Sequence, residues 1–260
     1  MGRESGTETA VTRGGDGAGG TSGRPPGGRL GQRLSGLVVA LGTVLFLGGF
    51  GWAALVYVPF TVPTPSMHPT IAAGDRVLAE RVDGSEVRRG DVVVFEQEEW
   101  ADAPLIKRVV AVGGDTVSCC AGGGLTVNGK RIDEPYTGDD PFAAMASFSE
   151  VTVPEGRLFL LGDDRTGSLD STAHLAEKAA GTVSRNAVKG RVDAVAWPMD
   201  GMLEPATGFR AVGDEPSVPG PLRTQVTLAV AGALLIFAGA AYGPVAGLLT
   251  RRRGTARAGG

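Results

Sequence analysis

Two long apolar stretches without a single charged residue stand out along the chain, residues 34–58 (25 residues) and 224–250 (27 residues). At about 1.5 Å of rise per helical residue, each can cross a hydrocarbon core of about 30 Å. The apolar region of a cleaved signal peptide is shorter, about 7–15 residues. We therefore predict two transmembrane helices, a buried core helix being the alternative for the second stretch.

Between them, residues 59–211 alternate short β-branched or aromatic runs with glycine-rich turns, a pattern typical of strands. The clearest hairpin signal is Asn128-Gly129, whose residues accept the positive φ angles of a type I′ turn. Ser171–Ala180 is the one expected helix, with a mobile loop as the alternative. We expect a mostly β fold, a compact antiparallel, barrel-like sheet domain between the two transmembrane helices. The expected strands are 91–95, 106–112, 125–127, 158–161 and 192–197.

Arginines mark the outer flanks of both apolar stretches. Arg24, Arg29 and Arg33 precede the first, and Arg251–Arg253 follow the second directly. Excess Lys and Arg marks the cytoplasmic side. We therefore predict a plasma-membrane protein with two spans, both termini cytoplasmic and the β domain outside.

The remaining segments have little to bury. Residues 1–33 are rich in Gly, Ser, Thr and Arg and are predicted to be a disordered cytoplasmic tail. Residues 212–223 are expected to be a linker, and residues 251–260 a basic cytoplasmic tail. The net charge of −3 argues only against wholesale nucleic-acid binding.

Ser66 and Lys107 are the candidate reactive residues. A serine hydroxyl is a weak nucleophile until a base takes its proton. His68 is too close along the chain to serve, and His174 lies in a polar segment. Lys107 sits among apolar neighbours, and burial can lower a lysine pKa by several units from about 10.4. The residues alone leave open a strand-edge lysine that points to water.

The two cysteines, Cys119 and Cys120, are adjacent. On an oxidising face they could form a labile bridge between neighbours, stay free thiols or link to another chain. Two adjacent sulfurs without a nearby histidine do not make a zinc site. We expect no metal and no cofactor.

An ordered set of motifs resembles the type I signal peptidases, membrane-bound serine–lysine proteases. The serine lies in a motif similar to the Ser-Met-x-Pro-Thr of that family, and the lysine begins a similar Lys-Arg motif. The resemblance covers residues 51–198, and its motifs are Ser66-Met67-His68-Pro69-Thr70, Gly74-Asp75-Arg76-Val77, Gly90–Phe95, Lys107-Arg108-Val109-Val110, Val153–Gly156, Gly162-Asp163-Asp164-Arg165 with Ser168, Asp170 and Ser171, Gly190-Arg191-Val192 and Trp197-Pro198.

The resemblance implies a role for each matching residue. Ser66 would be the nucleophile and Lys107 its general base. The oxyanion hole would consist of the Ser66 backbone N–H and the Thr64 hydroxyl. The supporting residues would be Ser168, which orients the lysine, Asp163, Arg165 and Asp170, which structure a loop, and Met67 in the substrate cleft. The family usually has an arginine after the Asp-Ser pair, but Thr172 stands there.

The function implied by the resemblance is removal of signal peptides from exported proteins by cleavage after small residues of the Ala-x-Ala type. The expected partners are the signal peptides of preproteins and membrane lipid, with the secretion machinery by association. Two other hypotheses remain: a self-cleaving repressor-type peptidase, which the two spans disfavour, and a catalytically impaired, membrane-tethered binding or accessory module of the same fold.

Overall fold

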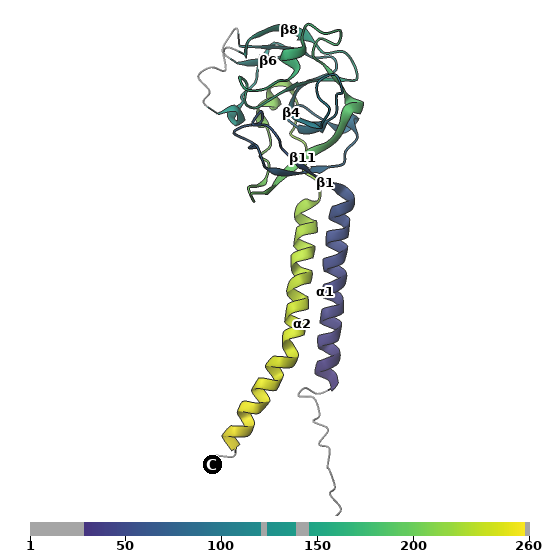
Figure 1. Cartoon of the computed structure of the whole chain (residues 1–260), viewed down its shortest axis with the longest axis vertical. Coiled ribbons are helices and arrows are strands. Elements are labelled where there is room, and N and C mark those ends of the chain that lie inside the picture. The colour runs from purple at the N-terminus through teal and green to yellow at the C-terminus, as the bar shows by residue number, and fades with distance from the viewer. Residues whose placement is uncertain (1–28, 121–123, 139–145, 258–260) are drawn as a thin grey trace, which may run out of the picture. The chain divides into compact units, whose positions relative to one another are not determined.

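The computed structural model describes residues 29–120, 124–138 and 146–257 (Figure 1). These residues fall into two compact units, one of residues 43–233 and one formed by residues up to 42 together with residues from 234 onwards. Helices α1 (Arg29–Val56) and α2 (Leu222–Arg257) each contribute to both units.

Both helices contain a segment long and apolar enough to cross a membrane. These segments are Leu30–Val56, with a mean hydropathy of 2.0, and Leu222–Val245, with 1.9. Helix α1 covers most of the first predicted span, but Tyr57 and Val58 belong to a strand. Residues 1–28 of the predicted tail lie outside the described residues, and residues 29–33 are helical.

The strands all lie in the unit of residues 43–233 and form two antiparallel sheets. The larger sheet, a curled half-barrel, has the order β1-β2-β11-β3-β4-β9-β10, with β12 paired to β11, and the smaller one has the order β7-β6-β5-β8. Their bounds are β1 (Tyr57–Thr61), β2 (Arg76–Glu80), β3 (Val92–Phe95), β4 (Leu105–Val112), β5 (Thr116–Cys119), β6 (Leu125–Val127), β7 (Lys130–Arg131), β8 (Phe148–Thr152), β9 (Arg157–Leu161), β10 (Val183–Ser184), β11 (Val188–Trp197) and β12 (Gly201–Met202).

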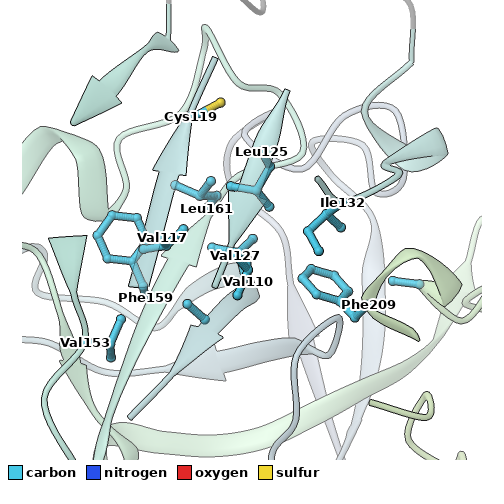
Figure 2. Close-up of a cluster of buried hydrophobic side chains, with 12 residues drawn as sticks. Val110, Val117, Cys119, Leu125, Val127, Ile132, Val153, Phe159, Leu161 and Phe209 are labelled. Carbon is cyan, nitrogen blue, oxygen red and sulfur yellow. The ribbon is translucent and has the colours of Figure 1, made fainter. Parts of the chain in front are cut away.

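A hydrophobic cluster joins the two sheets (Figure 2). Val110, Phe159 and Leu161 come from the larger sheet, and Val117 and Val127 come from the smaller one. All five side chains are buried, with exposed fractions of 2% or less. The curled sheet is therefore fixed on one side by the small sheet, which keeps β4 and β9 rigid.

The predicted fold class, mostly antiparallel β with apolar helices at both ends, is confirmed. Each of the five predicted strands is present, and Asn128 and Gly129 make the predicted hairpin turn with φ angles of 50° and 73°. The Ser171–Ala180 helix was a wrong prediction, because only Ser171–His174 form a single 3-10 turn, η4. The Leu160 backbone N–H donates to the Ser171 hydroxyl at 2.8 Å and ties this turn to β9, and Ala180 has a left-handed φ of 47°.

Helix α1 leads directly into the larger sheet. Strand β1 begins at the residue after the helix and pairs with β2 from Tyr57 opposite Glu80. The Arg81 guanidinium donates to the Leu55 carbonyl at 2.7 Å, which satisfies a carbonyl that a helix end leaves unpaired. The segment before Ser66 is therefore a paired strand rather than a free tether.

Candidate active site

Ser66 lies in the turn that follows β1. The backbone N–H of His68 donates to the Pro65 carbonyl at 2.8 Å, and that of Ile71 donates to the Met67 carbonyl at 2.9 Å. The side chains of Met67 and Ile71 are buried in a core cluster, which anchors the turn to the protein interior. The turn is thereby fixed with Ser66 only 5% exposed.

Lys107 comes from β4, a strand with six consecutive buried residues in its middle. Its side chain is 3% exposed, and its Nζ lies 2.6 Å from Ser66 Oγ in a hydrogen bond. The lysine therefore points into the protein toward the serine, and the alternative of a strand-edge lysine in water does not hold. The structure brings together the two residues that the sequence proposed as a pair.

The pKa of Lys107 is lowered from its ordinary value. Burial is the main cause, because the desolvated ammonium form is disfavoured, and the negative charges of Asp170 and Asp163 partly oppose the shift. The partner of Nζ is a neutral hydroxyl rather than a carboxylate. A lysine in this setting can lose its proton and accept one from the serine.

Arg108, the next residue on β4, has a different set of partners. Its guanidinium donates to both oxygens of Asp163, at 2.8 and 2.6 Å, and to the Gly90 carbonyl at 2.8 Å. Its charged carbon lies 3.9 Å from the centre of the Tyr136 ring. Thr70 Oγ1 donates to Asp163 at 2.6 Å, which ties the nucleophile turn to the same ion pair.

Gly162 gives the site its close packing. A Cβ atom on this residue would clash with both the Ser66 carbonyl oxygen and the Ser168 hydroxyl. The Asp164 N–H donates to the same Ser66 carbonyl at 3.2 Å. Ser168 Oγ is buried, and it has no hydrogen-bond partner among the described residues, Lys107 included. Ser168 thus lies beside the nucleophile, but its predicted bond to the lysine is absent there.

Asp170 is held by neutral groups. It accepts from the Gly162 N–H at 2.9 Å, from the Thr172 N–H at 3.1 Å and from the Thr172 hydroxyl at 2.8 Å. The arginine expected from the resemblance is therefore replaced by a hydroxyl donor. Arg165 pairs with Glu134 through two hydrogen bonds and not with Asp170.

Thr64 and Met67, two further predicted site residues, both lie close to Ser66 along the chain. Thr64 Oγ1 lies 3.3 Å from Ser66 Oγ, so its hydroxyl is next to the nucleophile. Met67 has no exposed surface. It supports the turn from within, and its predicted contact with substrate stays a prediction.

The other candidates from the sequence lie outside this arrangement. His174 stacks on Trp100 with ring centres 4.2 Å apart and contacts Glu177 at 2.6 Å. Cys119 and Cys120 form a disulfide between neighbours, the first of the three states considered. Within the described residues, no group of three or more His, Cys, Asp or Glu side chains could hold a metal ion.

Sequence reasoning gave no role to Thr70, Glu134 or Tyr136. Thr70 was visible within the serine motif, but its bond to Asp163 spans 93 residues of the chain. Tyr136 and Glu134 belong to a segment without any motif, and only the tertiary fold brings them to Arg108 and Arg165.

Comparison with known proteins agrees with this geometry. The family model for signal peptidase, peptidase S26, matches residues 34–197. A signal peptidase I of Mycobacterium tuberculosis (strain CDC 1551 / Oshkosh) is 33% identical over an alignment of 193 residues, gaps included, that covers 54% of this chain and 65% of that protein. A signal peptidase I of Bacillus licheniformis is 31% identical over 156 residues, 56% of this chain and 80% of the relative. The chain thus spans slightly less than two thirds of the mycobacterial relative.

Proposed function

Because the chain belongs to the signal peptidase family, peptidase S26, we propose that it is a membrane-anchored endopeptidase that removes signal peptides from exported proteins. The observation that carries the proposal is the 2.6 Å hydrogen bond between Lys107 Nζ and Ser66 Oγ. Both residues are buried, at 3% and 5% exposed, so a neutral lysine is favoured beside the serine. A serine–lysine dyad needs this combination of contact and desolvation.

The reaction begins with neutral Lys107. It takes the proton of Ser66 as Oγ attacks the scissile carbonyl carbon, which gives a tetrahedral intermediate. The intermediate collapses with cleavage of the C–N bond, and the Lys107 ammonium returns its proton to the leaving amine. An ester between Ser66 and the signal peptide remains.

Hydrolysis of the ester uses the same base. Lys107 takes a proton from a water molecule, and the resulting hydroxide attacks the ester carbon. Ser66 leaves with a proton from Lys107, and the signal peptide is released with a free carboxylate. Each half-reaction, acylation and deacylation, returns Lys107 to its neutral form, so no second acid or base is required.

The oxyanion of both intermediates needs hydrogen-bond donors. The backbone N–H of Ser66 and the Thr64 hydroxyl are proposed for this role. Support comes from the 3.3 Å distance between Thr64 Oγ1 and Ser66 Oγ, which puts the hydroxyl beside the oxygen that attacks the substrate carbonyl. The loss of one such donor typically costs about 2.7–4 kcal/mol in the transition state.

The substrates are proposed to be preproteins with small residues at the −1 and −3 positions. Their chains would bind extended and add to a strand beside the cleft. The two apolar helices would hold the enzyme in the lipid bilayer with both termini cytoplasmic, near the secretion machinery. The short paired strand between α1 and Ser66 would then keep the nucleophile close to the membrane surface.

The test is cleavage of a preprotein by the purified full chain in detergent, with Ser66→Ala and Lys107→Ala variants. Both variants should lose activity by a factor on the order of 10⁴. Lys189→Ala is the matched control, because the Lys189 side chain is 45% exposed and forms an ion pair with Glu96 on the surface. Normal cleavage by either variant rules out the dyad, and binding of preprotein without cleavage by the wild type identifies an accessory module.

A further inference from the structure

Two carboxylates, Asp163 and Asp170, place negative charge near Lys107, and they differ in whether a positively charged side chain compensates that charge. Asp163 forms a two-bond ion pair with Arg108 and also accepts from Thr70. Because the pair is neutral as a unit, its net effect on a nearby charge is small. Asp170 is the other carboxylate, and in the described part of the chain no Lys, Arg or His forms an ion pair with it.

Asp170 is nevertheless close to the reactive residues. It is 2% exposed, so water screens its charge poorly. Its carboxylate accepts from the Gly162 N–H at 2.9 Å. Gly162 in turn packs against the Ser66 carbonyl, and Ser66 Oγ is bonded to Lys107. One residue therefore separates the uncompensated charge from the serine–lysine pair.

Thr172 supplies the side-chain donor to this carboxylate. Its hydroxyl and its backbone N–H both bind one Asp170 oxygen, at 2.8 and 3.1 Å. These bonds hold the carboxylate in place without adding a positive charge. Of the other titratable groups in this region, Arg108 pairs with Asp163 and Arg165 with Glu134, Tyr136 lies against Arg108, and Asp164 accepts from the Gly167 N–H.

We propose that Thr172, a neutral residue, leaves Asp170 without a countercharge, and that this uncompensated charge raises the pH above which Lys107 acts as a base. The inference rests on the proposed function of Lys107. A negative charge near the lysine favours its ammonium form. The enzyme therefore needs a higher pH for activity than it would with a cation bound to Asp170.

The experiment adds that cation. Thr172 is partly exposed and lines a pocket of about 570 Å³ with Ser168, Arg165 and Leu175, so a longer side chain has room. In Thr172→Arg, the acid limb of the kcat/KM profile should move to lower pH by about 0.5–1 unit. The substrate is a peptide with an Ala-x-Ala site and no group that titrates in the range.

Three further variants separate charge from structure. Thr172→Lys places the cation on a different stem and should move the limb in the same direction. Thr172→Ser keeps the hydroxyl and Thr172→Val removes it without adding charge, so both should keep the limb of the wild type. A residue with a merely structural role would lower kcat/KM evenly at all pH values.

The outcomes are distinct from those that test the dyad. An unchanged unfolding midpoint shows that Thr172→Arg and Thr172→Lys are folded. If the acid limb does not move in these folded variants, and Lys107→Ala is inactive, the inference is overturned and the proposed function still stands. If neither cationic variant folds, Asp170→Asn replaces them, and it must also move the limb to lower pH. An active Lys107→Ala enzyme would instead reject the proposed function.

Discussion

Lys107 and Arg108 are neighbours on β4 and are both buried, at 3% and 2% exposed, and yet their pKa values shift in opposite directions. Burial lowers the pKa of Lys107, whose partner is the hydroxyl of Ser66. Burial acts on Arg108 in the same direction, but the paired Asp163 more than offsets it and raises the pKa. Burial alone therefore does not decide the charge of a basic side chain, because the partner decides it.

The position of Lys107 suits proton transfer, and that of Arg108 suits a structural ion pair. Successive residues of a strand project to opposite faces, so one strand can carry a reactive group and a structural one side by side. Arg108 fixes Asp163, Gly90 and Tyr136 with a permanent charge. Among the described residues, the hydrogen-bond partner of Lys107 Nζ is the neutral Ser66 hydroxyl, so the lysine can cycle between its charged and neutral forms.

The largest expected effect comes from Lys107→Met, which removes the base and keeps the volume. Activity on a preprotein should fall by a factor on the order of 10⁴. Stability should not fall, because the variant no longer buries an ionisable amine. Cleavage rates measure the loss of activity, and urea unfolding monitored by tryptophan fluorescence measures stability. A strongly destabilised variant would contradict the view that Lys107 is a reactive residue and not a structural one.

The second largest effect is expected at Arg108, where a substitution should lower stability. Arg108→Met should cost about 3–5 kcal/mol of unfolding free energy, because it leaves the Asp163 carboxylate buried without a partner. Combining it with Asp163→Leu should recover part of that loss, since both charges are then removed. Urea unfolding measures both variants. If Arg108→Met alone is as stable as wild type, the ion pair between Arg108 and Asp163 does not stabilise the fold.

Much of this comparison was predictable, but not all of it. The apolar neighbours of Lys107 left both a buried lysine and a strand-edge lysine in water open, and the resemblance of the motifs predicted its pairing with Ser66. Tyr57 and Val58 were assigned to the membrane span because apolar strand residues and apolar helix residues look alike in sequence. The Asp170 contacts with Gly162 and Thr172, and the Glu134 contact with Arg165, depend on which loops meet, and no local pattern encodes that.

A smaller effect is expected at Thr64, on the surface side of the dyad. Thr64→Val removes the hydroxyl that lies 3.3 Å from Ser66 Oγ and should lower kcat about 10²-fold, with little change in KM. Thr64→Ser is the matched control and should stay close to wild type. Equal rates for the valine and serine variants would exclude Thr64 from the oxyanion hole.

The central claim is that Lys107 works as a neutral base, and the pH dependence of kcat/KM for the full chain tests it most directly. Because the pKa of Lys107 is lowered, the rate should rise with pH through that value and level off before the ordinary lysine value of about 10.4. The rising limb should be absent from the residual activity of Lys107→Met. A wild-type rate that stays constant from about pH 6 to 10 would contradict a lysine base.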